Sequence, residues 1–194
     1  MKGDGHHTWT EEEIAQFEAY YPIGSRERLA FALGLYTGQR RGDVIRMGRQ
    51  HIRNGLLHVQ QQKTRAPLAI PIHPELAEVL VAAPDNQLAF LVTRLGGTFK
   101  GQAFTQWFTE ACREAGLVEC TFHGLRKAAC RRLAEAGCTV HEIAAISGHK
   151  TLKEIERYTR AVDQERLARK AMERTTAAAT ESELRRRKQG AETQ

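Results

Sequence analysis

Residues 29–43 read LAFALGLYTGQRRGD, an apolar run that ends abruptly in glycine and arginine. The first eight side chains are apolar on nearly every side of a helix, which is the pattern of a helix at the centre of a fold. Gly38 stops this helix, because glycine readily adopts the left-handed backbone that ends one. Arg40 and Arg41 therefore follow directly on a buried helix.

Helical periodicity continues on both sides of this stretch. A Thr followed three residues later by a Glu is a capping-box pattern, and it predicts helix starts at Thr10 and Thr151. The central helix is expected to begin near Arg26. Apolar stripes at helical spacing predict further helices that include residues 43–47, 74–83, 104–115, 125–133 and 140–144.

A small sheet interrupts the helices. Residues 56–62 and 67–72 read as two strands joined by a tight connection at Lys63–Ala66. Pro67 and Pro71 make the second an edge strand, since proline cannot donate to a neighbouring strand. The apolar segment LAFLV, residues 88–92, reads as a further short strand or extended segment. The expected fold class is α+β, mainly α-helical with a small antiparallel sheet.

The composition indicates a globular, basic chain. Its 194 residues include 29 Lys and Arg against 23 Asp and Glu, for a net charge of +6. No apolar run reaches the roughly 18–20 residues that a membrane span needs, and no membrane partner is expected. The positive charge is concentrated in residues 24–65, net +7, and 113–170, net +4. These segments would make one face for a phosphate backbone if the fold joins them; otherwise they merely solvate helix surfaces.

Four cysteines lie too far apart to form a disulfide framework for a chain of this size, and they fit a reducing cytosol. Two of them precede a histidine by three residues, in Cys120-x-x-His123 and Cys138-x-x-His141, which resembles two pairs of metal ligands. A zinc site needs all four side chains to converge. The interval between the pairs reads instead as a helix with an apolar stripe. Cysteines that pack as small hydrophobes, and no metal, are therefore expected.

Four short motifs follow one another along the chain: TGQRRGD at residues 37–43, Lys63 at the tip of the hairpin, HGLR at residues 123–126, and Gly148-His149 nine residues before Tyr158. In this order and spacing they resemble the catalytic domain of the tyrosine recombinases, the phage integrase family. The resemblance covers roughly residues 9–169. It implies the integrase catalytic-core fold and an enzyme that breaks and rejoins DNA at specific sites.

The resemblance implies a role for each motif residue. Arg40 and Arg126 would clamp the scissile phosphate, because a guanidinium binds two phosphate oxygens and stays protonated. Tyr158 would attack the phosphorus and form a 3′-phosphotyrosine, releasing a 5′-hydroxyl. The covalent link keeps the bond energy, so neither a metal nor ATP is expected as a cofactor.

Four further residues would support this attack. Lys63 would protonate the leaving 5′-oxygen. His123 and His149 would hydrogen-bond the phosphate or assist proton transfer. Asp43 would accept hydrogen bonds around Arg40 and hold it. Because an ordinary tyrosine has a pKa near about 10, the neighbouring cations would have to favour the phenolate.

Alternatives remain at both levels. Tyr158 follows Ile155 at helical spacing and is also explained by packing, Lys63 by a solvated turn, and His149 by a helix cap. For the whole protein, one alternative is a type IB topoisomerase. Such an enzyme shares this chemistry but relaxes supercoiled DNA without a specific target site. A DNA-binding remnant of a mobile element would bind without cleaving. An RNA-binding regulator lacks support, since no aromatic-rich sheet motif is present.

Residues 1–170 are expected to form the catalytic domain and residues 171–194 a C-terminal tail that can be helical and docks on a neighbouring protomer. The N-terminal DNA-clamp domain of most tyrosine recombinases is expected to be absent, which would reduce the affinity for DNA. The expected partner is double-stranded DNA, bound by a homo-tetramer on paired sites and by a monomer before assembly. The expected location is the bacterial cytoplasm, with the nucleoid. The target sequence, a phage or genomic-island origin, accessory proteins and a longer parent chain stay open.

Overall fold

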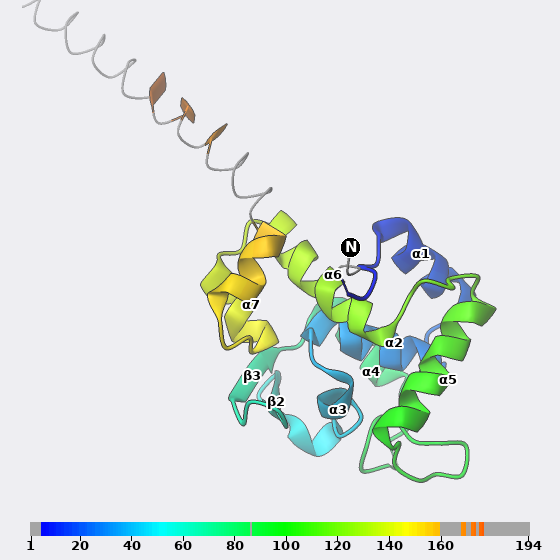
Figure 1. The fold of residues 1–194 in the computed structure, drawn as a ribbon. Coiled ribbons are helices and arrows are strands. Elements are labelled where there is room, and N and C mark those ends of the chain that lie inside the picture. The colour runs from blue at the N-terminus through cyan, green and yellow to red at the C-terminus, as the bar shows by residue number, and fades with distance from the viewer. Residues whose placement is uncertain (1–4, 86, 160–167, 170–171, 174, 177–194) are drawn as a thin grey trace, which may run out of the picture.

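The computed structural model describes residues 5–85, 87–159, 168–169, 172–173 and 175–176 of the chain (Figure 1). The elements, in chain order, are α1 (Glu11–Tyr20), α2 (Arg26–Thr37), α3 (Arg41–Val44), the 3-10 turn η1 (Arg49–His51), β1 (Ile52–Arg53), β2 (Leu56–Gln60), β3 (Pro67–Pro71), α4 (Pro74–Val81), α5 (Gly101–Glu114), α6 (Phe122–Glu135) and α7 (Val140–Ser147). Residues 152–159 are also helical. Most of the expected tail, 171–194, lies outside the described residues.

Helix α2 lies at the centre of the fold and packs against α6 and α4 (Figure 1). It is capped by Ser25 and ends at Gly38, whose φ of +60° is left-handed, as the sequence predicts. At Gly34 a Cβ would lie only 3.0 Å from the side chains of Phe122 and Leu125. The missing side chain lets α6 lie close against α2, and α6 carries the HGLR motif.

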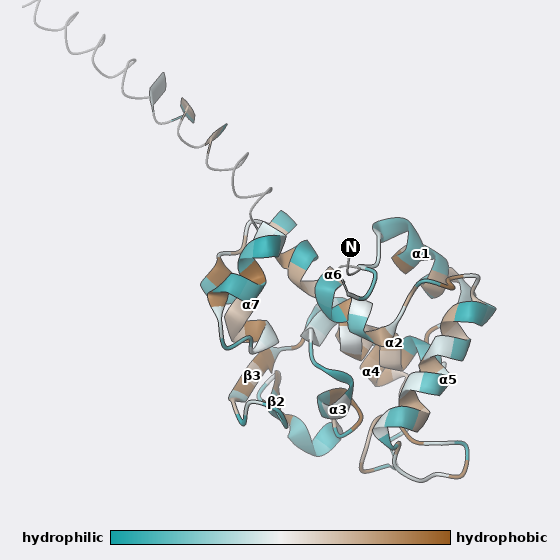
Figure 2. Cartoon of the chain, in the orientation of Figure 1, coloured by the Kyte–Doolittle hydropathy of each residue, from teal (hydrophilic) through white to brown (hydrophobic). Residues whose placement is uncertain are grey.

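Aromatic rings fill the core between α1, α2 and α5. The Phe17 ring stacks on Phe31, with centroids 4.9 Å apart, and on Phe108, with centroids 5.6 Å apart. Trp9 is fully buried beside them, and its indole N–H donates to the Thr121 carbonyl at 2.9 Å. In Figure 2, α1 and α5 alternate between hydrophilic and hydrophobic colour, as expected for helices with one buried face.

The sheet has three antiparallel strands in the order β1-β2-β3, which places the proline-rich β3 at an edge as predicted. The strand β1 was not predicted. Its hairpin to β2 turns on Asn54-Gly55, with φ values of +52° and +74°, and this dipeptide is a strong hairpin signal in a sequence. β2 ends at Gln60, two residues earlier than expected, because the next residue, Gln61, is fully buried in polar contacts.

Residues 88–92, expected as a short strand or an extended segment, do not form a strand of the sheet. In the described chain this segment makes a single β-bridge, between Val92 and Thr98. Its apolar side chains serve the core instead, since Phe90 and Leu91 are buried, and the Phe90 N–H donates to the Met47 carbonyl at 2.8 Å. A short apolar run therefore marks a buried loop here, which periodicity does not distinguish from a strand.

Side-chain caps fix the starts of several helices. The predicted capping box of Thr10 and Glu13 is present at α1. Thr139 and Glu142 form another at α7, which was not predicted. The helical residues 152–159 begin directly after Thr151, as the sequence indicates.

A second, small apolar cluster lies apart from the main core, on α6, α7 and the helical residues 152–159. Cys130, Ile143 and Ile155 are buried in it, and Tyr158 packs against it with part of its ring exposed. All four cysteines are free thiols. None of the described helices is long and apolar enough to cross a bilayer.

Candidate active site

The first arginine motif forms the junction between α2 and α3. Gly38 ends α2, and Arg40 is the residue before the first turn of α3. The Arg40 side chain therefore starts two residues after Gly38, at the end of the buried helix. The Arg40 guanidinium donates to the side-chain oxygen of Gln61 at 3.4 Å. Arg41 bonds to Thr105 on α5 instead.

The HGLR motif forms the first turn of α6. Thr121 caps the helix by accepting from the Gly124 N–H at 3.2 Å. His123 and Arg126 are three residues apart and therefore share one face of the helix. The Arg126 guanidinium is only 4% exposed, and its Nη1 donates to the carbonyls of Gly38, at 2.5 Å, and Ser147, at 2.7 Å.

The other terminal nitrogen of Arg126, Nη2, is placed to donate a hydrogen bond to an anion. Among the described residues, Nη2 is buried and has no hydrogen-bond partner. Burial, and next the charge of Arg40, lower the pKa of Arg126 to about 10, so the side chain still carries its charge at neutral pH. A buried donor without an acceptor costs about 1–3 kcal/mol, and a phosphate oxygen would relieve that cost.

These side chains meet at one cavity of about 380 Å³. Its lining includes both motif arginines and His123 together with Thr105 and the ring of His6. Arg40 of the TGQRRGD motif and His123 of the HGLR motif, more than 80 residues apart in sequence, thus line one basic cavity. The expectation that two positively charged segments share a face holds at this point.

His149 follows directly on the C-terminal end of α7, where Gly148 has a φ of +67°. The Ser147 hydroxyl donates its proton to the Ile143 carbonyl at 2.6 Å and therefore accepts from His149 Nδ1–H at 2.7 Å. The neutral ring keeps a lone pair on Nε2 as a consequence. Burial first, then Arg126 and Arg40, lower the pKa of His149 to about 3.

Tyr158 lies within electrostatic reach of the arginines but is not activated by them. Burial raises its pKa, and the charges of Arg157 and Arg126 only partly oppose that effect. In the structure without DNA the neighbouring cations favour the phenolate, but less strongly than burial disfavours it. Tyr158 is protonated at neutral pH, and its attack requires a proton acceptor.

Gln61 links four parts of the site and was missed by sequence reasoning. Its side-chain oxygen accepts from Arg40 and, at 2.6 Å, from Thr64. Its NH₂ donates to Gln39 at 2.6 Å and to the Ser147 carbonyl at 2.9 Å. A polar residue between two strands gives no sequence signal for this role, because its partners come from distant segments.

Gly148 makes room for this network. A Cβ at Gly148 would lie 2.4 Å from the Gln61 side-chain nitrogen, closer than atoms can approach. The left-handed backbone at this residue also favours glycine. The glycine of the Gly-His motif thus has two separate structural reasons.

Asp43 is placed differently from the expectation. Its carboxylate is buried, accepts from the Gln62 backbone N–H at 2.8 Å, and pairs with Arg46 at 3.3 Å. Arg40 is held by Gln61 instead. The Asp43 carboxylate therefore fastens the β2–β3 turn to α3, while the Asp43 backbone N–H donates to the Arg40 carbonyl at 2.9 Å.

Lys63 is exposed in the β2–β3 turn. Within the described part of the chain it makes no hydrogen bond or ion pair with the other five expected catalytic residues. The structure brings Arg40, His123 and Arg126 to one cavity and places His149 and Tyr158 within electrostatic reach of them. It leaves Lys63 apart, on a turn that Asp43 anchors.

The two Cys-x-x-His pairs belong to different places. Cys120 is buried in the main core, and Cys138 packs at the small cluster. Among the described residues, the ligand atoms that do converge, within 4.8 Å, belong to His7, Glu13 and Cys120. Glu13 already binds His7 and the Thr10 N–H, and burial raises the pKa of the Cys120 thiol. These contacts fasten the N-terminal segment to the fold.

Replacing Gln61 by Leu is expected to lower the free energy of unfolding by about 1–3 kcal/mol, because buried partners such as Gln39 lose their hydrogen bonds. Urea unfolding measures this change. The matched control is Gln62→Leu, since Gln62 is exposed and bonds to Asp43 through its backbone. Equal stability of the two variants would contradict the network.

The low pKa of His149 predicts an acid-sensitive fold. Its folded pKa, about 3, lies below the unfolded value near about 6.5. As the pH falls through this window, the unfolded chain binds a proton that the folded protein does not, so stability is lost. Urea unfolding between pH 7.5 and 4 should show a steeper loss for the wild type than for His149→Gln. Parallel curves would refute the assignment.

Curated relatives of the chain are integrases and recombinases. The integrase of Escherichia phage HK022 is 29% identical over 133 residues, covering 62% of this chain and 37% of that protein. The shufflon-specific DNA recombinase of Escherichia coli is 30% identical over 132 residues, covering 66% of this chain and 33% of that protein. The chain thus spans little more than a third of the length of these relatives.

Solved structures agree. The lambda integrase catalytic core superposes with a TM-score of 0.63 at 25% identity, over 75% of this chain and 92% of that one. The XerA recombinase, at 17% identity and a TM-score of 0.68 over 85% of this chain and 66% of that one, supports the fold alone. The family model described as "Phage integrase family" matches residues 9–165. Because this match covers most of its length, the chain belongs to the phage integrase family.

Proposed function

We propose that the chain is the catalytic part of a site-specific DNA recombinase in which Tyr158 cleaves one strand of a DNA duplex. One observation carries the proposal. Arg40 and the buried Arg126 reach the same cavity, and Nη2 of Arg126 has no partner among the described residues. Two guanidinium groups, one of which has a terminal nitrogen without a hydrogen-bond partner, fit a phosphodiester better than a neutral ligand.

The chemical step is an in-line transfer of a phosphoryl group. The Tyr158 oxygen bonds to phosphorus, the bond from phosphorus to the 5′-oxygen breaks, and the two arginines stabilise the charge on the non-bridging oxygens. The reaction runs backwards when a 5′-hydroxyl attacks the phosphotyrosine. Because the number of phosphodiester bonds is conserved, rejoining needs no ATP.

Proton transfers accompany both ends of the step. The raised pKa of Tyr158 requires an acceptor for its proton, and neutral His149 offers the lone pair on Nε2. His123 contributes a hydrogen bond to the phosphate from the first turn of α6. Lys63 supplies the proton to the leaving 5′-oxygen when DNA brings the β2–β3 turn to the cavity.

The partner in this proposal is double-stranded DNA, bound by four protomers at paired sites and by a monomer before assembly. Support comes from relatives, since one solved structure at 25% identity and a TM-score of 0.66, over 81% of this chain and 49% of that one, is a lambda integrase tetramer bound to a Holliday junction. Residues 171–194 would dock on a neighbouring protomer. The place of action would be the bacterial cytoplasm, at the nucleoid.

The two competing functions receive less support. A topoisomerase would use the same chemistry, but the curated relatives reported above carry integrase and recombinase names. In a non-catalytic remnant, the buried and unpaired donor of Arg126 would lower the stability of the fold without serving catalysis.

The first test is a covalent adduct. The full chain is incubated with a pool of nicked duplexes of random sequence, whose short released fragment diffuses away and traps the intermediate. Adducts that survive denaturation are then captured and sequenced. Tyr158→Phe should yield at least about 10³-fold less adduct than the wild type, because the nucleophile is lost.

The matched control for this test is Tyr20→Phe, since Tyr20 is exposed on α1. All proteins are first checked for equal thermal stability. Adduct formation by folded Tyr158→Phe at the wild-type level, or no adduct from the folded wild type, would contradict the proposed function.

The role of Lys63 predicts a chemical rescue. Lys63→Ala should slow cleavage of an ordinary phosphodiester by about 10²–10⁴-fold, as expected for loss of a general acid. Replacing the bridging 5′-oxygen by sulfur should restore most of the rate, because a thiolate leaves without a proton. The matched control is Arg65→Asn, which suits the left-handed backbone there and removes a neighbouring charge. A Lys63→Ala variant equally slow on both substrates would exclude this role.

A further inference from the structure

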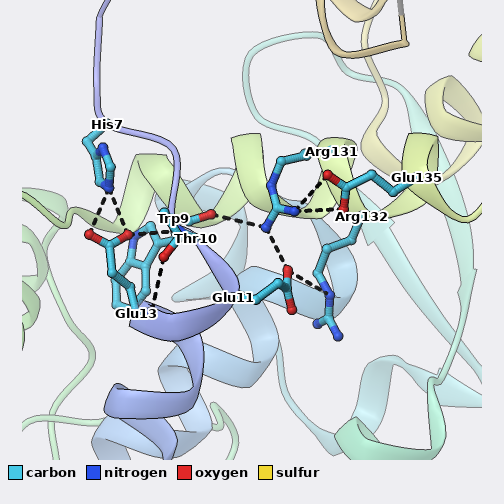
Figure 3. A network of polar contacts seen from close by, with 8 residues as sticks. All are labelled: His7, Trp9, Thr10, Glu11, Glu13, Arg131, Arg132 and Glu135. Carbon is cyan, nitrogen blue, oxygen red and sulfur yellow. Dashed lines mark hydrogen bonds and ion pairs between the residues drawn. The ribbon is translucent and has the colours of Figure 1, made fainter. Parts of the chain in front are cut away.

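The N-terminal segment, residues 5–9, is fastened to the first half of α6. Its anchor is the fully buried Trp9, whose indole N–H donates to the Thr121 carbonyl. The Trp9 carbonyl accepts from Arg131 at 3.2 Å, and Glu11 pairs with the same arginine at 2.6 Å (Figure 3). These contacts hold the segment against the helix that carries the HGLR motif.

Gly124 of that motif lets the segment lie close. A Cβ at Gly124 would lie 2.3 Å from the His7 carbonyl oxygen and 2.8 Å from the Trp9 ring, which is too close for any side chain. The His7 ring itself points to the carboxylate of Glu13, at 2.7 Å (Figure 3). The position of the glycine between the catalytic histidine and arginine is thus explained by the N-terminal segment, not by the phosphate.

His6 is the residue of this segment that reaches the cavity. Its ring centroid lies 4.7 Å from that of His123, with the planes tilted by 48°. Its Nδ1 lies 3.2 Å from the hydroxyl of Thr121, and its carbonyl accepts from Lys127 at 2.6 Å. Three contacts to the start of α6 therefore fix His6, which is one of the residues that line the cavity with the two motif arginines.

His6 shapes the surroundings of His123. Burial lowers the pKa of His123 to about 4, and the next largest cause is the charge of His6. The other groups that act on His123 are Arg126 and Lys127 on α6 and Arg40 at the start of α3, all of them cations. A second imidazole among these charges disfavours a proton on His123.

We infer that His6 is a positioning residue for strand cleavage, which packs against the His123 ring and holds it at the cavity that Arg40 and Arg126 line. The inference rests on the proposed function, because it concerns the same site. The proposed role is specific to His6. The neighbouring His7 bonds to Glu13 and makes no ring contact with His123 among the described residues.

The first experiment measures the titration of His123 by NMR in the full chain without DNA. His6→Ala should raise the pKa of His123 toward its ordinary value near about 6.5, because one face of the ring becomes solvated. His6→Phe should raise the pKa less than His6→Ala does, since a ring still covers His123 and only the electrostatic effect of His6 is lost. His7→Ala, the matched control in the same segment, should also leave it unchanged.

The second experiment measures the rate of adduct formation on the nicked duplex selected by the wild type. His6→Ala should react about tenfold more slowly at saturating DNA, as expected for a misplaced group. Its pH profile should shift in the same direction as the His123 titration. DNA affinity should change little, and His7→Ala should follow the wild type.

Three results would overturn the inference: an unchanged His123 titration in His6→Ala, a changed titration with an unchanged cleavage rate, or equal effects of His6→Ala and His7→Ala. The last would mean that docking of the segment alone matters. Failure of the proposed function is recognised separately, because a folded wild type would then form no adduct while the NMR titration would still report the contact between His6 and His123.

Discussion

The buried guanidinium of Arg126 is the interaction on which the site depends. Its Nη1 bonds to the carbonyl of Gly38, which ends α2, and to that of Ser147, which lies at the end of α7. Two carbonyls that no longer have helical partners are satisfied by one cation. The same contact brings the first arginine motif, the HGLR motif and the Gly-His motif together. The one donor left over, Nη2, stays buried for the anion.

Two arginines close together disfavour further positive charge in the site. Burial and these arginines lower the pKa values of His123 and His149, so both rings are neutral at neutral pH. Arg40 lies close enough to Arg126 to lower the pKa of Arg126, and both arginines lower the pKa of His149. Two fixed positive charges and neutral imidazoles limit the repulsion around the cavity. Tyr158 packs against the small apolar cluster and is protonated, because burial raises its pKa.

Much of the fold was predictable because its signals are local. The apolar run of α2, the glycine that ends it, the capping box at Thr10 and the prolines of β3 each act within a few residues. Local signals did not suffice where distant partners decide the outcome: residues 88–92 make one β-bridge and no strand of the sheet, and the Asp43 carboxylate bonds to the β2–β3 turn. Gln61 and His6 carry no local signal at all, since their contacts come from segments far away in the chain.

The order and spacing of the motifs are enough to assign the family and to name the motif residues, because neither depends on geometry. The helices whose caps and apolar stripes are local are predictable in the same way. Which of these residues meet, which tautomer His149 adopts, and that burial outweighs the neighbouring cations at Tyr158 follow from the folded arrangement of the chain. The physical reason is that pKa values and hydrogen bonds depend on burial and on partners brought together from distant segments, which spacing along the chain does not encode.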